Sequence, residues 1–107
     1  MNTKEFVKAF YNEKQKFLAE YLSKNSETEV GQLVSSLNLT NDQTEIMKKL
    51  MDGALTDVFY TILLGLDGSA SIGGEQEMYD LKDENGNQLS GDGEIEAYAY
   101  EYFQEAE

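Results

Sequence analysis

One segment of the sequence, residues 42–66, restricts the possible folds more than any other. On a helical wheel its apolar side chains cover well over half of the circumference. A helix with so wide an apolar surface needs neighbours on several sides, so we expect it to form the centre of the fold. A glycine in mid-helix costs about 1 kcal/mol relative to alanine, so Asp52-Gly53 could kink or split this helix. The apolar residues of the segment are Ile46, Met47, Leu50, Met51, Ala54, Leu55, Val58, Phe59, Ile62, Leu63 and Leu66.

Two further helices are expected before the central one. Residues 3–23 place their apolar side chains on one broad face, and Asn2 with Glu5 fits a capping box. Lys14 falls inside this apolar face, and we expect its amine to reach water along the aliphatic stem. A second, shorter amphipathic pattern covers about residues 27–37.

The region after the central helix contains a strong turn signal. Asn85-Gly86 favours a type I′ turn, which predicts a small antiparallel β-hairpin at about residues 75–90. The tail from Glu94 to Glu107 can be drawn as a helix or as a strand. Its length and its many alanines and glutamates favour the helix, with Asp92 as its N-cap.

Together these elements predict an α+β fold in a single domain, residues 1–107. Three N-terminal helices pack around the hydrophobic central helix of about residues 42–66, followed by the hairpin of about 75–90 and a C-terminal helix. The chain is long enough to bury a modest core, and its 11% aromatic residues supply the bulk for one.

The net charge of the chain lies entirely in its second half. Residues 1–50 contain seven acids and seven lysines, whereas residues 51–107 contain fourteen acids and one lysine, Lys82. Such asymmetry weakens the compact state by self-repulsion and is typical of a surface that meets a positive partner. With a net charge of −13 and no arginine, direct binding to nucleic acid is not expected.

The residue types that are missing narrow the chemistry further. The chain has no histidine, cysteine, arginine, proline or tryptophan. Cysteine is a common catalytic nucleophile, histidine is the commonest general base, and both are common ligands of transition metals. We therefore expect neither an enzyme, nor a cofactor, nor a metal centre. The N-terminal residues do not form a signal-peptide pattern and no apolar stretch could span a bilayer, so we expect a cytoplasmic protein that does not bind membranes.

One stretch resembles the spacing of a calcium loop without matching it. Asp83, Asn85, Asn87 and Glu94 stand at positions 1, 3, 5 and 12 of such a loop. The glycine required at position 6 is replaced by Gln88. A turn-rich hairpin tip is therefore the better interpretation, and weak calcium binding through residues 83–94 is kept as an alternative.

The acidic second half remains the main functional signal. We expect a small binding protein that occludes a basic partner, such as a nuclease-type toxin or another nucleic-acid enzyme. In size and charge it is similar to bacterial immunity proteins and to inhibitors that mimic DNA. The alternative is an accessory domain whose acids only keep it in solution. The expected partner-binding residues are Glu75, Glu77, Asp80, Asp83, Glu84, Asp92, Glu94, Glu96, Tyr100 and Glu101.

Overall fold

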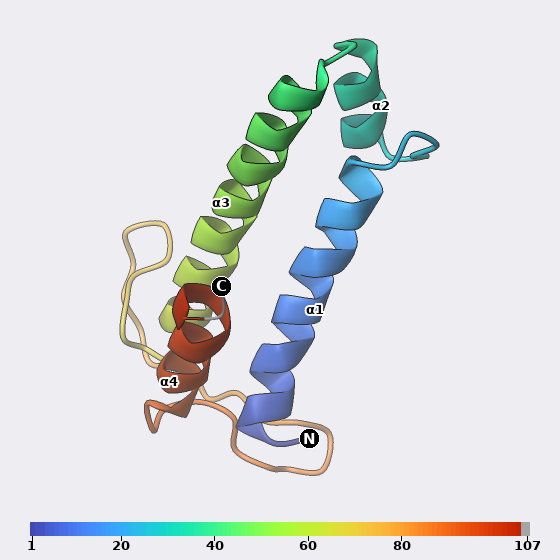
Figure 1. The fold of residues 1–107 in the computed structure, drawn as a ribbon. Helices are drawn as coiled ribbons and strands as arrows, with labels where there is room; N and C mark the ends of the chain where they lie inside the picture. Colours follow the sequence, from blue (N-terminus) through green and yellow to red (C-terminus); the bar gives the residue numbers. More distant parts are fainter. Residues whose placement is uncertain (106–107) are drawn as a thin grey trace.

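A long antiparallel pair of helices forms the frame of the molecule (Figure 1). The computed structural model describes residues 1–105. Helix α1 (Thr3–Tyr21) and helix α3 (Asn41–Leu66) lie side by side, joined at one end by the short helix α2 (Glu29–Ser36). At the other end, α4 (Glu94–Tyr100) and the π-helical turn η1 (Glu101–Glu105) pack against the pair. The molecule is elongated, with extents of 47 × 28 × 25 Å.

The two ends of the molecule differ in what they carry. We call the end formed by residues 22–50, with α2 and the first half of α3, the α2 end. The opposite end, with the chain's N-terminus, the loop of residues 67–93 and α4, is the α4 end (Figure 1). The three helices expected in the first 66 residues are confirmed, and their first and last residues differ from the expected ones by at most two positions.

Side-chain caps explain where these helices begin. The expected capping box is present at α1, where Asn2 Oδ1 accepts from Glu5 N at 2.8 Å and Asn2 N donates to Glu5 Oε1 at 3.0 Å. Thr40 and Gln43 form a second box at α3. Asp52-Gly53 does not split the helix, because α3 runs without a break from Asn41 to Leu66.

The predicted α+β class is wrong. Within residues 1–105 the protein is helical, with no strand and only two isolated bridges, Ile72–Glu75 and Lys82–Gln88. The expected hairpin does not extend into paired strands, because the Ser90 side chain makes hydrogen bonds to the backbone that strand pairing would otherwise make. Leu81 N donates to Ser90 Oγ at 2.9 Å, and Ser90 Oγ donates to Tyr79 O at 2.6 Å. The single bridged pair Lys82–Gln88, with no further paired residues beside it, does not make a stable sheet.

The turn at the tip of this segment is also of another type. A type I′ turn needs positive φ at both of its central residues. Gly86 has φ of +83°, but Asn38 is the one non-glycine residue with positive φ among those the structure describes. Asn85 therefore keeps the ordinary backbone conformation, and the turn does not favour the twist of two paired strands.

The hydrophobic core lies at the α4 end. It joins α1, α3, α4 and η1 through Val7, Leu63, Ile95, Ala99 and Phe103, all of them buried. Aromatic rings surround it: Phe103 packs edge-on against Tyr11 and Phe59, with ring centroids 5.7 and 6.4 Å apart. The expectation of neighbours on several sides holds only for the second half of α3. In its first half, Ile46 and Leu50 are 65% and 62% exposed.

Lys14 does not extend to water as expected. Its side chain is 7% exposed and its Nζ lies 2.9 Å from Asp52 Oδ1 and 3.0 Å from Thr56 Oγ1. The amine also lies over the rings of Tyr11 and Phe103, at 5.3 and 5.6 Å from their centroids. Because α3 supplies both oxygen acceptors, the charge is satisfied inside the helix pair and fixes α1 against α3.

Among residues 1–105, no helix combines the length and the apolar character that a bilayer span requires.

Candidate functional site

A buried carboxylate at the end of α3 holds α4 in place. Asp67 is 5% exposed; its Oδ1 accepts from Gly91 N at 3.0 Å and its Oδ2 from Glu96 N at 3.1 Å. Helix α4 begins after Gly93, which has no side chain for a cap. Asp67 supplies the missing acceptor from another helix, at the third residue of α4, where N-cap side chains normally bond. The start of α4 is thereby positioned by the residue that ends α3.

The expected N-cap of α4 is wrong by one residue. Asp92 does accept a hydrogen bond from Glu94 N at 3.0 Å, but the capping residue is Gly93, in a left-handed conformation with φ of +83°. The loop reverses direction at Gly93, and glycine adopts this conformation without strain. The tail itself is helical over Glu94–Glu105, and its residues 106–107 lie outside the described part.

A hollow lies between α4, η1 and α3. Its floor and walls are two tyrosines and three glutamates, with Gly93 and Ala97 completing it. We call it the α4 hollow, and it is lined by Tyr60, Gly93, Glu96, Ala97, Tyr100, Glu101 and Glu105.

The α4 hollow is both aromatic and negative. Tyr100 is 51% exposed, so much of its ring is accessible to a binding partner. Partial burial, followed by the charge of Glu96 and the proximity of Tyr100, raises the pKa of the Tyr60 hydroxyl above its usual value. Ring faces beside carboxylates suit a guanidinium or ammonium group, which gains from the ring and from charge-assisted hydrogen bonds.

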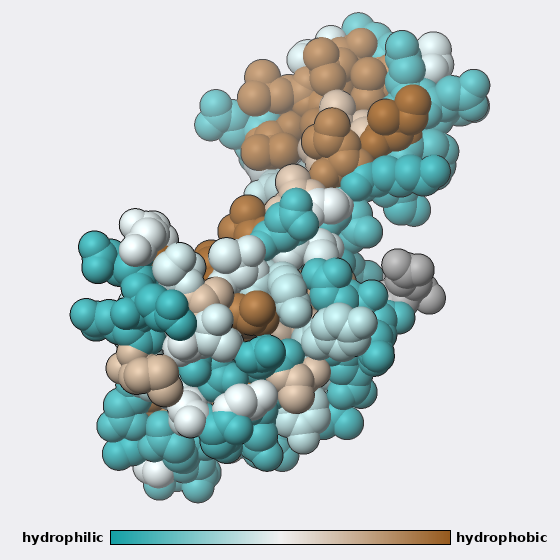
Figure 2. Space-filling view, turned by 90° about the vertical axis from the view of Figure 1, so that its left-hand side faces the viewer, coloured by the Kyte–Doolittle hydropathy of each residue, from teal (hydrophilic) through white to brown (hydrophobic). Residues whose placement is uncertain are grey.

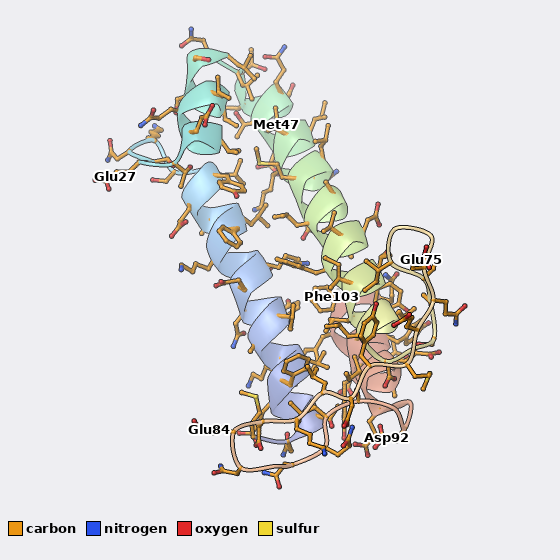
Figure 3. The ribbon with its side chains drawn as sticks, turned by 180° about the vertical axis from the view of Figure 1, so that it is seen from behind. Glu27, Met47, Glu75, Glu84, Asp92 and Phe103 are labelled. Carbon is orange, nitrogen blue, oxygen red and sulfur yellow. The ribbon has the colours of Figure 1, made fainter. Side chains whose placement is uncertain are left out.

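The ten expected binding residues do not form one face. Glu96, Tyr100 and Glu101 come together in the α4 hollow. Glu94 instead lines a second hollow, with the N-terminal residues and Gln88. In Figure 3, Glu84 lies near the start of α1, Asp92 near α4 and Glu75 beside α3, so these acids surround the α4 end. Glu77 is also exposed, in the same 67–93 loop.

Asp80 and Asp83 are engaged within the protein. Asp80 lies 3.5 Å from Lys82 Nζ, and a hydrogen bond from Gln88 and the Lys82 charge lower its carboxyl pKa. Asp83 accepts from Asn85 N, Asn87 N, Asn87 Nδ2 and the Met1 amine, all at 2.9–3.0 Å. These donors leave the Asp83 side chain 8% exposed, so it organises the turn and presents little of its charge to a partner.

The same contacts bear on the calcium alternative. Both oxygens of Asp83, the first position of the supposed loop, are occupied by donors of the turn. Within residues 1–105 there is no group of three acids placed to hold a metal ion. The structure therefore offers this alternative no support.

The hydrogen bonds of Asp83 predict a specific acid sensitivity. They hold the pKa of its carboxyl far below the usual value of 3.8, with the Asn87 side chain as the largest cause. A depressed folded-state pKa contributes stability that is complete above about pH 4 and is lost as the pH falls toward the folded value. We expect chemical denaturation of the wild type to show this loss between about pH 4 and pH 2.

Asp83→Asn serves as the control for this pH effect. Other carboxyls titrate in the same range, so the difference in stability between wild type and variant isolates Asp83. That difference should shrink as the pH falls. A constant difference from pH 7 to pH 2 would contradict the assigned role.

Of the polar side chains that line the α4 hollow, two are absent from the residues expected from the sequence. Tyr60 lies on α3 and Glu105 on η1, and only the packing of α4 on α3 brings Tyr60 beside Glu96. The local pattern around Tyr60 is that of a core helix and contains no signal for this site. Glu105 shares a helical side with Glu101, a spacing that a longer helix wheel could have indicated.

No known protein family, curated protein or solved structure matches this chain. The site is therefore interpreted from its own geometry and charge.

Proposed function

We propose that this protein binds a basic protein through its α4 end and covers the surface with which the target holds phosphate groups. The target would be a nucleic-acid enzyme such as a nuclease-type toxin. The protein would then act as an immunity protein or as an inhibitor that mimics DNA. Inhibition needs no catalytic group, in keeping with a chain that lacks histidine, cysteine and arginine.

The observation that carries the proposal is the α4 hollow. It combines an exposed tyrosine with the carboxylates of Glu96, Glu101 and Glu105, which have no ion-pair partner within residues 1–105. Tyrosine is a frequent interface anchor, and unpaired carboxylates around it remain available to lysines and arginines. The remaining exposed acids of the 67–93 loop surround the same end (Figure 3).

The charge distribution also favours fast association with a basic target. Residues 67–105 hold eleven acids and one lysine, whereas residues 22–50 hold four acids and three lysines. A concentrated field of one sign can raise association rates by about 10- to 1000-fold at low salt. Screening above about 0.1 M salt removes most of this gain.

A charge-reversal pair tests the site. Glu96→Lys with Glu101→Lys should slow association with the basic partner about tenfold or more, because both side chains line the α4 hollow. Thermal stability should be unchanged or slightly raised, since repulsion among the acids falls. The measurement is affinity capture at low salt from the source cells, followed by surface plasmon resonance with the purified partner.

The matched control reverses two exposed acids at the other end of the molecule. Glu27→Lys with Glu45→Lys changes the net charge equally and should leave association within about twofold of the wild type. Equal slowing by both pairs would show that overall charge, and not the α4 hollow, directs binding. A partner held equally at low and high salt would contradict an electrostatic site.

A further inference from the structure

Helix α2 presents a stripe of apolar side chains to solvent. Val30, Leu33 and Leu37 follow one another at spacings of three and four residues, so they share one side of the helix, and they are 39%, 60% and 56% exposed. Val34, by contrast, is half-buried and lines a hollow with Tyr21 at the end of α1. Helix α2 is therefore attached through another side, and its stripe is left uncovered within residues 1–105.

The first half of α3 continues this apolar surface. Ile46 and Leu50 lie one turn apart and are mostly exposed, whereas Met47 and Met51 beside them are half-buried. Figure 2 looks at the molecule from the α3 side, and there the apolar surface gathers at the α2 end, while the α4 end is mainly hydrophilic. We call this surface the α2–α3 patch, made of Val30, Leu33, Leu37, Ile46 and Leu50.

The α2–α3 patch has the size of an interaction surface. Its five side chains together expose a few hundred Å² of apolar surface, and a patch of this order often marks a contact with a partner. A standard interface takes about 800 Å² from each partner and combines an apolar centre with a polar rim. The patch supplies such a centre, and the charged residues around it supply the rim.

Helix α2 has its own physical need for a neighbour. It has eight residues, fewer than the twelve to fifteen or so that an isolated helix requires to be stable in water. A helix this short depends on packing of its apolar side, and the apolar stripe of α2 is exposed. A partner that covers the stripe would therefore stabilise α2 itself.

The charges around the patch favour a second copy of the chain over other partners. Residues 22–50 hold four acids and three lysines, all of them exposed and none in an ion pair within residues 1–105. This nearly neutral rim attracts neither a strongly basic protein nor an anionic lipid surface. A second copy brings the same acids and lysines, so opposite charges can meet across a two-fold axis.

The acidic end of the molecule does not oppose such a contact. Ile46 lies about 30 Å from Asp67 along α3, given a rise of 1.5 Å per residue. This distance is several times the screening length of about 8 Å at physiological salt, so the acids hardly repel a copy bound at the α2 end. Contact through the α4 end would instead bring together two surfaces of the same sign.

We propose that the protein forms a symmetric dimer through its α2 end, with the two acidic ends pointing away from one another. The two-fold axis passes between the α2 part and the α3 part of the patch. It therefore places the α2 stripe of each copy on Ile46 and Leu50 of the other. The α4 hollow of each copy stays outside this contact.

Self-association of the full chain tests the proposed surface. By sedimentation equilibrium from about 1 µM to about 1 mM, the wild type should approach the mass of a dimer. Leu33→Glu should raise the dissociation constant about a hundredfold or more, because the two-fold axis places the added carboxylate in the apolar contact twice. Leu33 is exposed in the monomer, so circular dichroism at about 1 µM should show unchanged helicity.

Val58→Glu is the matched control. It adds the same charge at an apolar position of α3 that is 53% exposed but lies three turns beyond Ile46, outside the patch. Its dissociation constant should stay within about threefold of the wild type. Equal weakening by Leu33→Glu and Val58→Glu would show that total charge controls association, and it would overturn the proposed surface.

Cross-linking between copies tests the arrangement of the two patches. The chain has no cysteine, so a Leu33→Cys copy mixed with a Leu50→Cys copy can be joined by a short bis-maleimide only at the introduced residues. The proposed dimer predicts a product that contains both variants, recognised by a size tag on one of them. A Leu33→Cys copy mixed with a Val58→Cys copy should give about tenfold less of the mixed product.

Two further results would overturn the proposal. One is cross-linking of Leu33→Cys to Val58→Cys as efficient as to Leu50→Cys. The other is a wild type that remains monomeric up to about 1 mM. If that monomer instead bound vesicles of neutral phosphatidylcholine, the occupant of the α2–α3 patch would be a lipid surface and not a second copy.

Discussion

Truncation of Phe103 to alanine is expected to lower the free energy of unfolding by about 3–5 kcal/mol. Phe103 is 8% exposed and lies where α1, α3 and η1 meet, with its ring against Tyr11 and Phe59. Its removal leaves a cavity among residues held by two helices, which cannot collapse fully to fill it. It also removes one of the two rings beneath the Lys14 amine.

The measurement is urea unfolding, with Tyr100→Ala as the matched control. Tyr100 lies on the same C-terminal segment but is 51% exposed, so its truncation should cost less than about 1 kcal/mol. The loss expected for the Phe103 variant is a large share of the total, since the folded state of a domain is stabilised by about 5–15 kcal/mol. Equal effects of the two truncations would show that the described core is not where the stability lies.

Replacement of Asp67 by alanine should cost about 2–4 kcal/mol and should detach the start of α4. The carboxylate accepts two backbone hydrogen bonds in a buried position, and each bond to a charged group contributes about 1.5–3 kcal/mol. The variant also leaves the amides of Gly91 and Glu96 without their acceptors. Because α4 carries Glu96 and Tyr100, the α4 hollow should lose its shape along with the helix start.

Two measurements separate this local effect from a change in total charge. Glu77→Ala removes an equally negative but exposed side chain from the neighbouring loop and should change stability by less than about 0.5 kcal/mol. Hydrogen exchange should become faster at Glu96 N in the Asp67 variant, with smaller changes at the middle of α1. Protection of Glu96 N equal to that of the wild type would contradict the capping role of Asp67.

The errors of the sequence-based fold have identifiable physical causes. The sequence predicts the place of the turn at Asn85-Gly86, although not its type. A β-ladder, however, forms only where backbone N–H groups of one strand donate to backbone carbonyls of the other. Here the Ser90 hydroxyl accepts from Leu81 N and donates to Tyr79 O, in place of backbone groups of a facing strand. The spacing of apolar residues in the sequence does not predict such a side-chain contact. The sequence predicts that the Lys14 amine reaches water, because its actual acceptors cannot be seen in the local pattern. These acceptors, Asp52 and Thr56, lie about forty residues away on another helix.

By itself, the sequence determined the three longer helices, the capping box of α1 and the charge difference between the two halves of the chain. These follow from spacings of three and four residues and from side chains that bond to backbone atoms within one turn. Only the tertiary structure decided that Asp67 caps α4, that Tyr60 joins the glutamates of the α4 hollow, and that the outer face of α3 stays bare. Each of these depends on contacts between segments far apart in the chain, and such contacts are set by packing and not by local pattern.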